Sequence, residues 1–194
     1  LWALPTAQID AINKNLGQSE TSGVDIGVNY SHKIQGFGGM KYEFVGTYVK
    51  EFKVEIPGLG KYDCIGLHGG TCGAPQPEWR HKMRGTWETP WNFDLALTWR
   101  HIGKVDQEGT SSNPILATDV QPADRTLGER NYFDIAASYA LTKKITIRGG
   151  INNLMDKDPP LSGLVGAGFG NGNTYPQVYD ALGRRVFINV TASF

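Results

Sequence analysis

The sequence predicts an all-β protein, an antiparallel transmembrane β-barrel segment, from three observations. Apolar and polar residues alternate along stretches of about ten residues, as in strands with one apolar face. Short turns and long polar connections alternate between these stretches, as in outer-membrane barrels. Tryptophans lie near both ends of two apolar stripes, where aromatic girdles mark membrane interfaces: Trp79, Trp87, Trp91 and Trp99.

The composition fits this fold class. The chain has 194 residues, a formal net charge of zero and 25 glycines, a mixture that suits strands and turns. Balanced charge gives no electrostatic argument for a nucleic-acid partner, and we expect none. No apolar run approaches the ~20 residues of a membrane helix. A negative mean hydropathy is still compatible with a membrane barrel, whose strands are apolar on one face only.

We expect seven strands. The first, about residues 7–33, contains VDIGVNYSHK, in which Val24, Ile26, Val28 and Tyr30 share one face. In the second, MKYEFVGTYVKEF, the opposite face carries Lys41, Glu43, Thr47 and Glu51 together with Val45. The other five are residues 79–88, 91–100, 131–141, 145–153 and 184–194. The turns QGFGG, TPW and TKK alternate with long connections at about residues 57–77, 104–129 and 156–180.

Seven strands do not close a barrel by themselves. Bacterial single-chain barrels have even strand numbers, and both edges of this sheet would be unpaired in lipid. The sequence therefore predicts partner strands from elsewhere. Its first residues, LWALPTAQ, hold no recognisable targeting segment, so we expect an upstream portion. A soluble antiparallel sandwich also alternates, but it does not readily explain the rhythm of short and long connections.

Three stretches resemble the C-terminal end of TonB-dependent outer-membrane receptors. GGINNLMDKDPP, at 149–160, is similar to the family's "GxxNLFDxxPP"-type ending of the penultimate strand, with Met155 where Phe is usual. YDALGRRVFINVTASF, at 179–194, resembles the final strand with its terminal aromatic. NLGQSETSGVDIGV resembles a descending strand in which Gly23 precedes Val24 and Asp25. We interpret the asparagines and prolines of the first motif as structural, because they end strands.

The resemblance implies that residues 1–194 are the last seven strands of a barrel of about 22 strands. It also implies an upstream plug domain, an upstream TonB box that contacts the TonB complex, and a Gram-negative outer-membrane location. The implied activity is energised uptake of a scarce large nutrient, such as an iron chelate, a vitamin or a glycan. A passive pore or structural barrel without TonB coupling is the alternative, and a soluble β-rich binding module is a third possibility.

Two cysteines, Cys64 and Cys72, flank a glycine-rich loop in KYDCIGLHGGTCGAP. A disulfide that staples this loop is the favoured interpretation, and it would indicate an oxidising compartment. Two free thiols are the alternative. A zinc site would need more ligands than His68 supplies.

Candidate binding residues fall into two groups. The first is a basic stripe on the polar face, which consists of Arg80, Lys82 and Arg84. This stripe could be a lumen track for an anionic substrate. It could instead pair with acids on neighbouring strands, namely Glu43, Glu51 and Asp94, and with the plug. We favour the pairing, because the total charges are equal. The second is a set of loop residues that could contact a ligand, namely Tyr62, His68, Phe169, Tyr175 and Tyr179.

The sequence predicts neither catalysis nor a cofactor. No Ser/His/Asp or Cys/His constellation has supporting context, and GFGNGN does not join a strand to a helix as a phosphate loop would. The last strand resembles the signal by which outer-membrane assembly machinery recognises a barrel, carried by Val186, Ile188, Val190 and Phe194. A lipid-facing interface aromatic is the simpler interpretation of Phe194, and both can hold.

Overall fold

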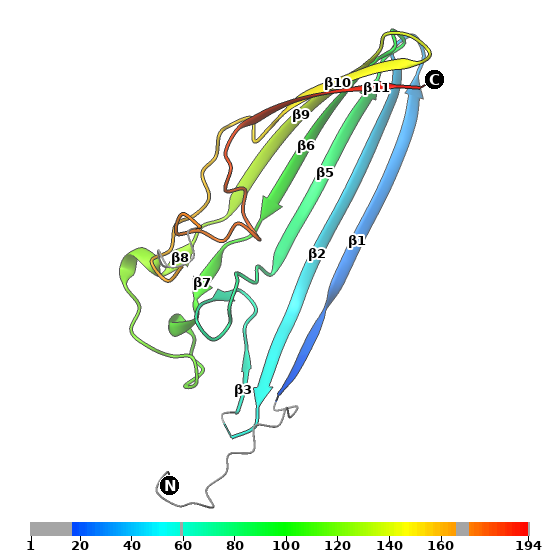
Figure 1. Ribbon diagram of the computed structural model, residues 1–194. Coiled ribbons are helices and arrows are strands. Elements are labelled where there is room, and N and C mark those ends of the chain that lie inside the picture. Colours follow the sequence, from blue (N-terminus) through cyan, green and yellow to red (C-terminus); the bar gives the residue numbers. More distant parts are fainter. Residues whose placement is uncertain (1–16, 59, 166–170, 194) are drawn as a thin grey trace, which may run out of the picture.

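A long antiparallel sheet forms one side of the molecule (Figure 1). The computed structural model describes residues 17–58, 60–165 and 171–193. Within them, seven long strands pair in the order β1-β2-β5-β6-β9-β10-β11. Their bounds are Gln18–Ile34, Gly38–Ile56, Trp79–Glu88, Phe93–Ile102, Arg130–Ala140, Ile145–Asn152 and Arg185–Ala192. The seven predicted strands are therefore confirmed; the part of the first strand predicted at 7–16 lies outside the described residues.

The register places apolar side chains together across the sheet. Val28, Phe44, Met83, Trp99 and Phe133 are successive cross-strand partners through five strands. One residue further along, Glu43, Arg84, Thr98 and Asp134 form a polar row in the same way. Because neighbouring residues of a strand point to opposite faces, the wall has an apolar face and a polar face.

A β-bulge reverses this alternation near the loop end of β2. The pairing runs regularly to Gly23 and Val49, but Ser22 pairs with Glu51, so Lys50 has no partner on β1. Glu51 therefore lies on the same side as the apolar face and pairs with Lys53 at 2.7 Å. The prediction that Glu51 belongs to the polar face is wrong, because alternation alone does not reveal the extra residue.

The bulge also supplies a core for the loops. Beyond it, three apolar side chains turn to the polar-face side and pack on a buried cluster of Tyr62, Cys64, Cys72 and Leu116; they are Phe52, Val54 and Ile56. Charged residues occupy the opposite side of this stretch of β2. Without the bulge, the alternation of the rest of β2 would have placed the apolar side chains there.

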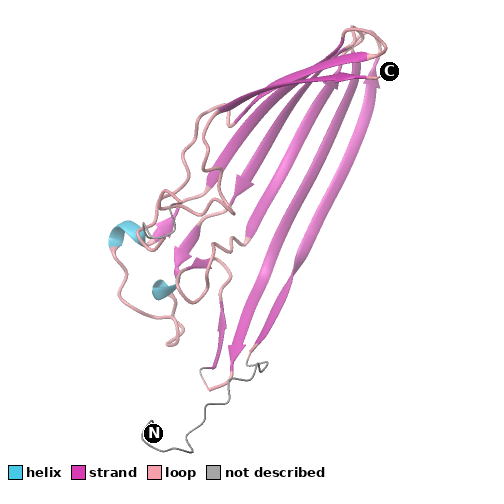
Figure 2. Ribbon diagram, viewed as in Figure 1, coloured by secondary structure: helices cyan, strands magenta, loops and turns pink. Residues whose placement is uncertain are grey.

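Short turns lie at one end of the wall and long connections at the other (Figure 1). The long connections contain more structure than predicted (Figure 2). β3 (Gly60–Asp63) pairs with β2, while β4 (Leu67–His68), β7 (Val105–Gln107) and β8 (Thr126–Leu127) form a second small sheet. Two short 3-10 helices, η1 (Glu108–Thr110) and η2 (Pro122–Asp124), complete them. The described residues contain no helix that is long and apolar enough to cross a membrane.

The connections pack on one another to form what we call the loop layer, the described parts of residues 57–78, 103–129 and 153–184. Ala74 of the first connection packs against its main buried cluster, which draws residues from the second and third connections: Val105, Leu127, Val165, Tyr175 and Tyr179. The sequence predicted long irregular loops, whereas the structure contains a packed layer with its own core.

Candidate functional site: the polar face beneath the loop layer

Aromatic side chains form a belt at each end of the apolar face. At the short-turn end, Trp87 stacks on Phe37 with ring centroids 4.5 Å apart and meets Trp91 edge-on at 6.3 Å. At the loop end, Trp79 lies 5.7 Å from His81, and His81 lies 4.4 Å from Trp99. The predicted tryptophan positions at both strand ends are therefore confirmed as two separate belts.

A recess of about 540 Å³ lies between the polar face and the loop layer. The wall contributes basic side chains, and the loops contribute Gln76 and Gln177 together with prolines. The basic side chains that line the recess are Arg80, Lys82 and Arg100. Arg84, the third member of the predicted basic stripe, lines a separate recess of about 150 Å³ that lies nearer the short-turn end of the wall.

The members of the stripe differ in their ion pairing. Arg84 lies opposite Glu43 on the neighbouring strand, with Nε 3.9 Å from its carboxylate. Within residues 17–58, 60–165 and 171–193, Arg80 and Lys82 have neither an ion pair nor a side-chain hydrogen bond, and both are exposed. The expected neutralisation by strand acids is therefore present for Arg84 alone in the described chain.

Arg100 joins the wall to the third long connection. Its Nε donates to Asp134 at 2.9 Å, and its Nη2 donates to Asp134 at 2.9 Å and to Asp180 at 3.0 Å. The Asp180 side chain is almost fully buried, and its carboxylate also forms an ion pair with the Arg185 guanidinium at 3.5 Å. The guanidinium lies over the Tyr132 ring, 5.0 Å from its centroid. This network holds the loop layer against the wall beside the recess.

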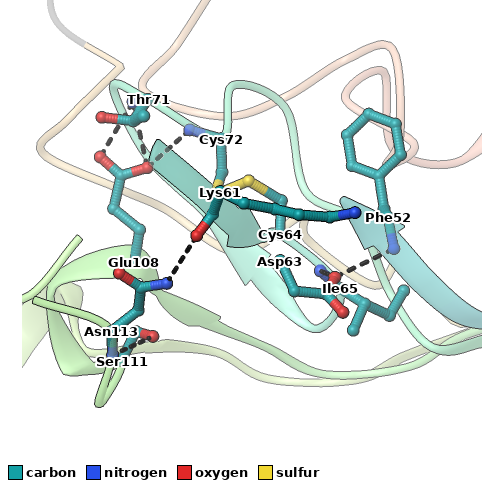
Figure 3. The surroundings of a disulfide bond; sticks show 10 residues. All are labelled: Phe52, Lys61, Asp63, Cys64, Ile65, Thr71, Cys72, Glu108, Ser111 and Asn113. Atoms are coloured by element: carbon teal, nitrogen blue, oxygen red, sulfur yellow. Dashed lines mark hydrogen bonds between the residues drawn. A yellow bond between two sulfur atoms is a disulfide. The ribbon is translucent and has the colours of Figure 1, made fainter. Parts of the chain in front are cut away.

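The disulfide Cys64–Cys72 is present, as predicted, with Cα atoms 5.4 Å apart. Figure 3 shows Glu108 beneath the stapled loop, where its carboxylate accepts hydrogen bonds from two backbone N–H groups. The Thr71 N–H lies 2.9 Å from Oε1, and the Cys72 N–H lies 2.6 Å from Oε2. A buried carboxylate with charge-assisted bonds of this kind fixes the loop shape.

The aromatic loop residues lie inside the loop layer. Tyr62, His68 and Tyr175 are at most 8% exposed, and Phe169 lies outside the described residues. His68 is fully buried, with Nδ1 3.4 Å from the Tyr175 hydroxyl, and burial lowers the pKa of its imidazole. Burial raises the pKa of Tyr175, and it raises the pKa of Tyr179 to about 12. These positions describe a packing role; ligand contact by these residues stays a prediction.

The motif at 149–160 forms a clasp at the end of β10. The Asn153 N–H donates to Asp134 at 2.8 Å, and its side chain bonds the backbone N–H and carbonyl of Lys157. Asp156 accepts the Arg184 N–H at 2.8 Å, which ties the start of the long connection to its end. These contacts fit the structural interpretation of Asn153.

The last strand presents three branched apolar side chains on the apolar face, Val186, Ile188 and Val190, each more than half exposed. Phe194 lies outside the described residues. The role of these four residues as an assembly signal stays a prediction.

Sequence reasoning missed Arg100, Asp180 and Glu108 as organising residues. The sequence could have predicted the pair of Arg100 and Asp134, because both lie on the polar faces of neighbouring strands and their positions differ by two residues along the strands. Asp180 and Glu108 lie in connections whose path no periodicity reveals.

A family model described as "TonB dependent receptor-like, beta-barrel" matches residues 3–154. The chain belongs to this TonB-dependent receptor family. Among solved structures, a ferric enterobactin receptor mutant from Pseudomonas aeruginosa is 17% identical with a TM-score of 0.58, over 90% of this chain and 22% of that chain. The siderophore receptor PiuA from Acinetobacter baumannii is 16% identical with a TM-score of 0.54, over 92% and 22%.

A copper transporter, OprC, is 18% identical with a TM-score of 0.53, over 91% of this chain and 23% of that chain. At these identities the likeness establishes a shared fold. The chain spans less than a quarter of the length of each of these solved proteins.

Proposed function

We propose that this chain is the C-terminal part of the barrel of an outer-membrane receptor, which takes up a scarce large nutrient with energy from TonB. The nutrient is an iron chelate, a vitamin or a glycan. The observation that carries the proposal is a sheet with aromatic belts at both ends of its apolar face, in a chain that belongs to the TonB-dependent receptor family.

Open edges support a larger barrel. Within the described residues, β1 pairs only with β2, and β11 pairs only with β10. Backbone N–H and C=O groups at such edges cannot remain unpaired in lipid, so further strands must complete the wall. We propose that the rest of the protein supplies these strands and a plug domain within the lumen. The other proposed partners are the TonB complex and the bilayer.

The polar face supports the assignment of the lumen. The loop layer covers this face and forms the recess with it, whereas the apolar face carries the belts. A barrel in lipid turns its apolar face outward, because a charged side chain at mid-membrane costs about 2–4 kcal/mol. The basic stripe therefore lines the proposed passage.

The test uses the full-length receptor and needs no knowledge of the nutrient. Purified receptor is inserted into planar bilayers, and its binding to the periplasmic domain of TonB is measured separately. We expect no steady ohmic conductance, because a plug fills the lumen, and we expect binding of the TonB domain. A steady open conductance without TonB binding would establish the passive-pore alternative and refute energised uptake.

A further inference from the structure

We propose that the contact of His68 with Tyr175 is an acid-sensitive latch, which holds the first long connection against the third and opens when His68 gains a proton. The latch goes beyond the proposed function, because it assigns regulation by pH to the loop layer. His68 lies between Cys64 and Cys72, so the disulfide loop carries it into the layer. It is fully buried, and its Nδ1 lies 3.4 Å from the Tyr175 hydroxyl.

The stapled loop that carries His68 is a point where the three connections meet. β4, which contains His68, pairs with β7 of the second connection. Glu108 of the same connection accepts the backbone N–H groups of Thr71 and Cys72. Tyr175 of the third connection meets the His68 ring edge-on, with ring centroids 5.7 Å apart. A change of charge at His68 therefore acts where all three connections are in contact.

The buried imidazole is suited to the neutral state. In the described part of the chain, its Nε2 is buried and makes no hydrogen bond, and His68 forms no ion pair. A second proton makes both ring nitrogens donors, whereas the Tyr175 hydroxyl lies beside one of them only. A buried positive charge without a partner is unfavourable, so protonation favours release of the ring to water.

Three carboxylates lie near enough to attract a charged His68, and each already accepts other donors. They are Glu108, Asp124 and Asp106. Glu108 accepts two N–H groups of the stapled loop. Asp124 accepts the Gly163 N–H at 2.6 Å, and Asp106 accepts the Thr126 hydroxyl at 2.6 Å. Burial outweighs the attraction of these carboxylates and lowers the pKa of His68.

Acid favours the open form of the loop layer. A histidine exposed to water has a pKa near 6.5, and the buried His68 has a lower pKa. The open layer therefore binds the proton more strongly than the closed layer does. The stability that the neutral ring contributes is complete above the pKa of the exposed form and is lost as the pH falls below it.

Opening of the latch uncovers the recess on the polar face. Gln76 of the first connection and Gln177 of the third line this recess from the side of the loop layer. Tyr175 lies two residues before Gln177, and His68 lies in the same connection as Gln76. Separation of the two rings therefore frees both parts of the layer that cover the recess.

The experiment measures hydrogen exchange of residues 171–184 in the purified full-length receptor, corrected for the intrinsic exchange rate at each pH. The strand amides of the wall are the internal reference. Between about pH 7.5 and about pH 5.5, we expect the opening equilibrium of this segment to rise about tenfold, the effect of one proton taken up near pH 6.5. Carboxylates stay largely ionised in this range, because their reference pKa values are about 4.

His68→Asn is the test variant, because an amide does not titrate and can still bond the Tyr175 hydroxyl. His101→Asn is the matched control, since His101 lies on β6 of the wall. The chain has four histidines, and His68 is the one within the loop layer. The pH dependence should disappear in His68→Asn and persist in His101→Asn. Heat-modifiable migration on gels checks folding, and His68→Phe is a second variant that does not titrate.

Two results would overturn the latch. One is exchange of residues 171–184 that does not change with pH in the unaltered receptor, a measurement that needs no variant. The other is a pH dependence that is equal in the unaltered receptor and in the His68 variants. Neither result bears on the TonB and conductance test, so the latch and the proposed function can fail separately.

Discussion

The strand wall and the loop layer are stabilised in different ways. The wall is held by cross-strand pairing and leaves large apolar side chains exposed, such as Ile188 at 77%. The loop layer buries its apolar residues in two clusters and adds a disulfide and a buried carboxylate. The wall is therefore built for a surrounding apolar solvent, whereas the loop layer is built like a small water-soluble domain.

The difference extends to sequence patterning. In the wall, burial within the chain does not distinguish the two faces: Val28 on the apolar face and Val45 on the polar face are similarly exposed, at 52% and 61%. In the loop layer, burial decides, and His68 and Cys64 are both 0% exposed. Substitutions at equally exposed wall positions on opposite faces should therefore have unequal effects.

The largest expected effect comes from a charge on the apolar face. Val28→Arg should destabilise the full-length receptor by about 2–4 kcal/mol, because the guanidinium would enter hydrocarbon. Unfolding from vesicles in urea or guanidinium measures this cost. The substitution should destabilise the wall and leave the contacts within the loop layer unchanged.

Val45→Arg is the matched control, since Gly27, the neighbour of Val28 along β1, is its cross-strand partner on the opposite face. Its cost should stay below about 1 kcal/mol, the repulsion from Lys82 directly opposite. If the two valine substitutions cost the same, the assignment of the two faces is wrong.

A second test separates the loop layer from the wall. Replacing Cys64 and Cys72 by Ser should destabilise the loop layer by about 2–3 kcal/mol, the chain-entropy value for a loop of this size. The measurement is the rate at which a protease cleaves residues 57–78 in the full-length receptor. The thermal transition of the barrel should not change, and a matching loss of barrel stability would show that the two regions are one cooperative unit.

The face alternation of the wall is what made it predictable. Period-two patterning places Phe44, Met83 and Trp99 on one side without any knowledge of the partner strands, and the register confirmed them as neighbours. The same rule failed at Glu51, because a bulge adds one residue without any change in composition. Alternation therefore predicts a strand only up to its first irregularity.

The site was less predictable, because it depends on contacts between distant segments. Arg80 and Lys82 could be identified as part of a basic stripe, but their lack of acidic partners among the described strands follows from where Glu43 and Glu51 point. The burial of His68 follows from packing against Tyr175, which is 107 residues away. No local pattern records such a contact.

The smallest effect concerns the joint between the two regions. Asp180→Asn removes one carboxylate from Arg100 while Asp134 remains, and it should loosen residues 153–184 from the wall at a cost of about 1–2 kcal/mol. Hydrogen exchange of that connection in the full-length receptor measures the loosening. The strand amides of the wall should keep their protection.

Asp156→Asn is the control for this joint. Its ion pair with Arg184 is 3.7 Å long, its side chain is 55% exposed, and the asparagine oxygen can still accept the Arg184 N–H, so the substitution should cost well under about 1 kcal/mol. A larger effect at the buried Asp180 than at the exposed Asp156 would mean that the loop layer is attached to the wall through Arg100. Equal effects would mean that the clasp at the end of β10 carries as much of the attachment as the buried network does, and the two regions would then be joined along the whole connection rather than at one point.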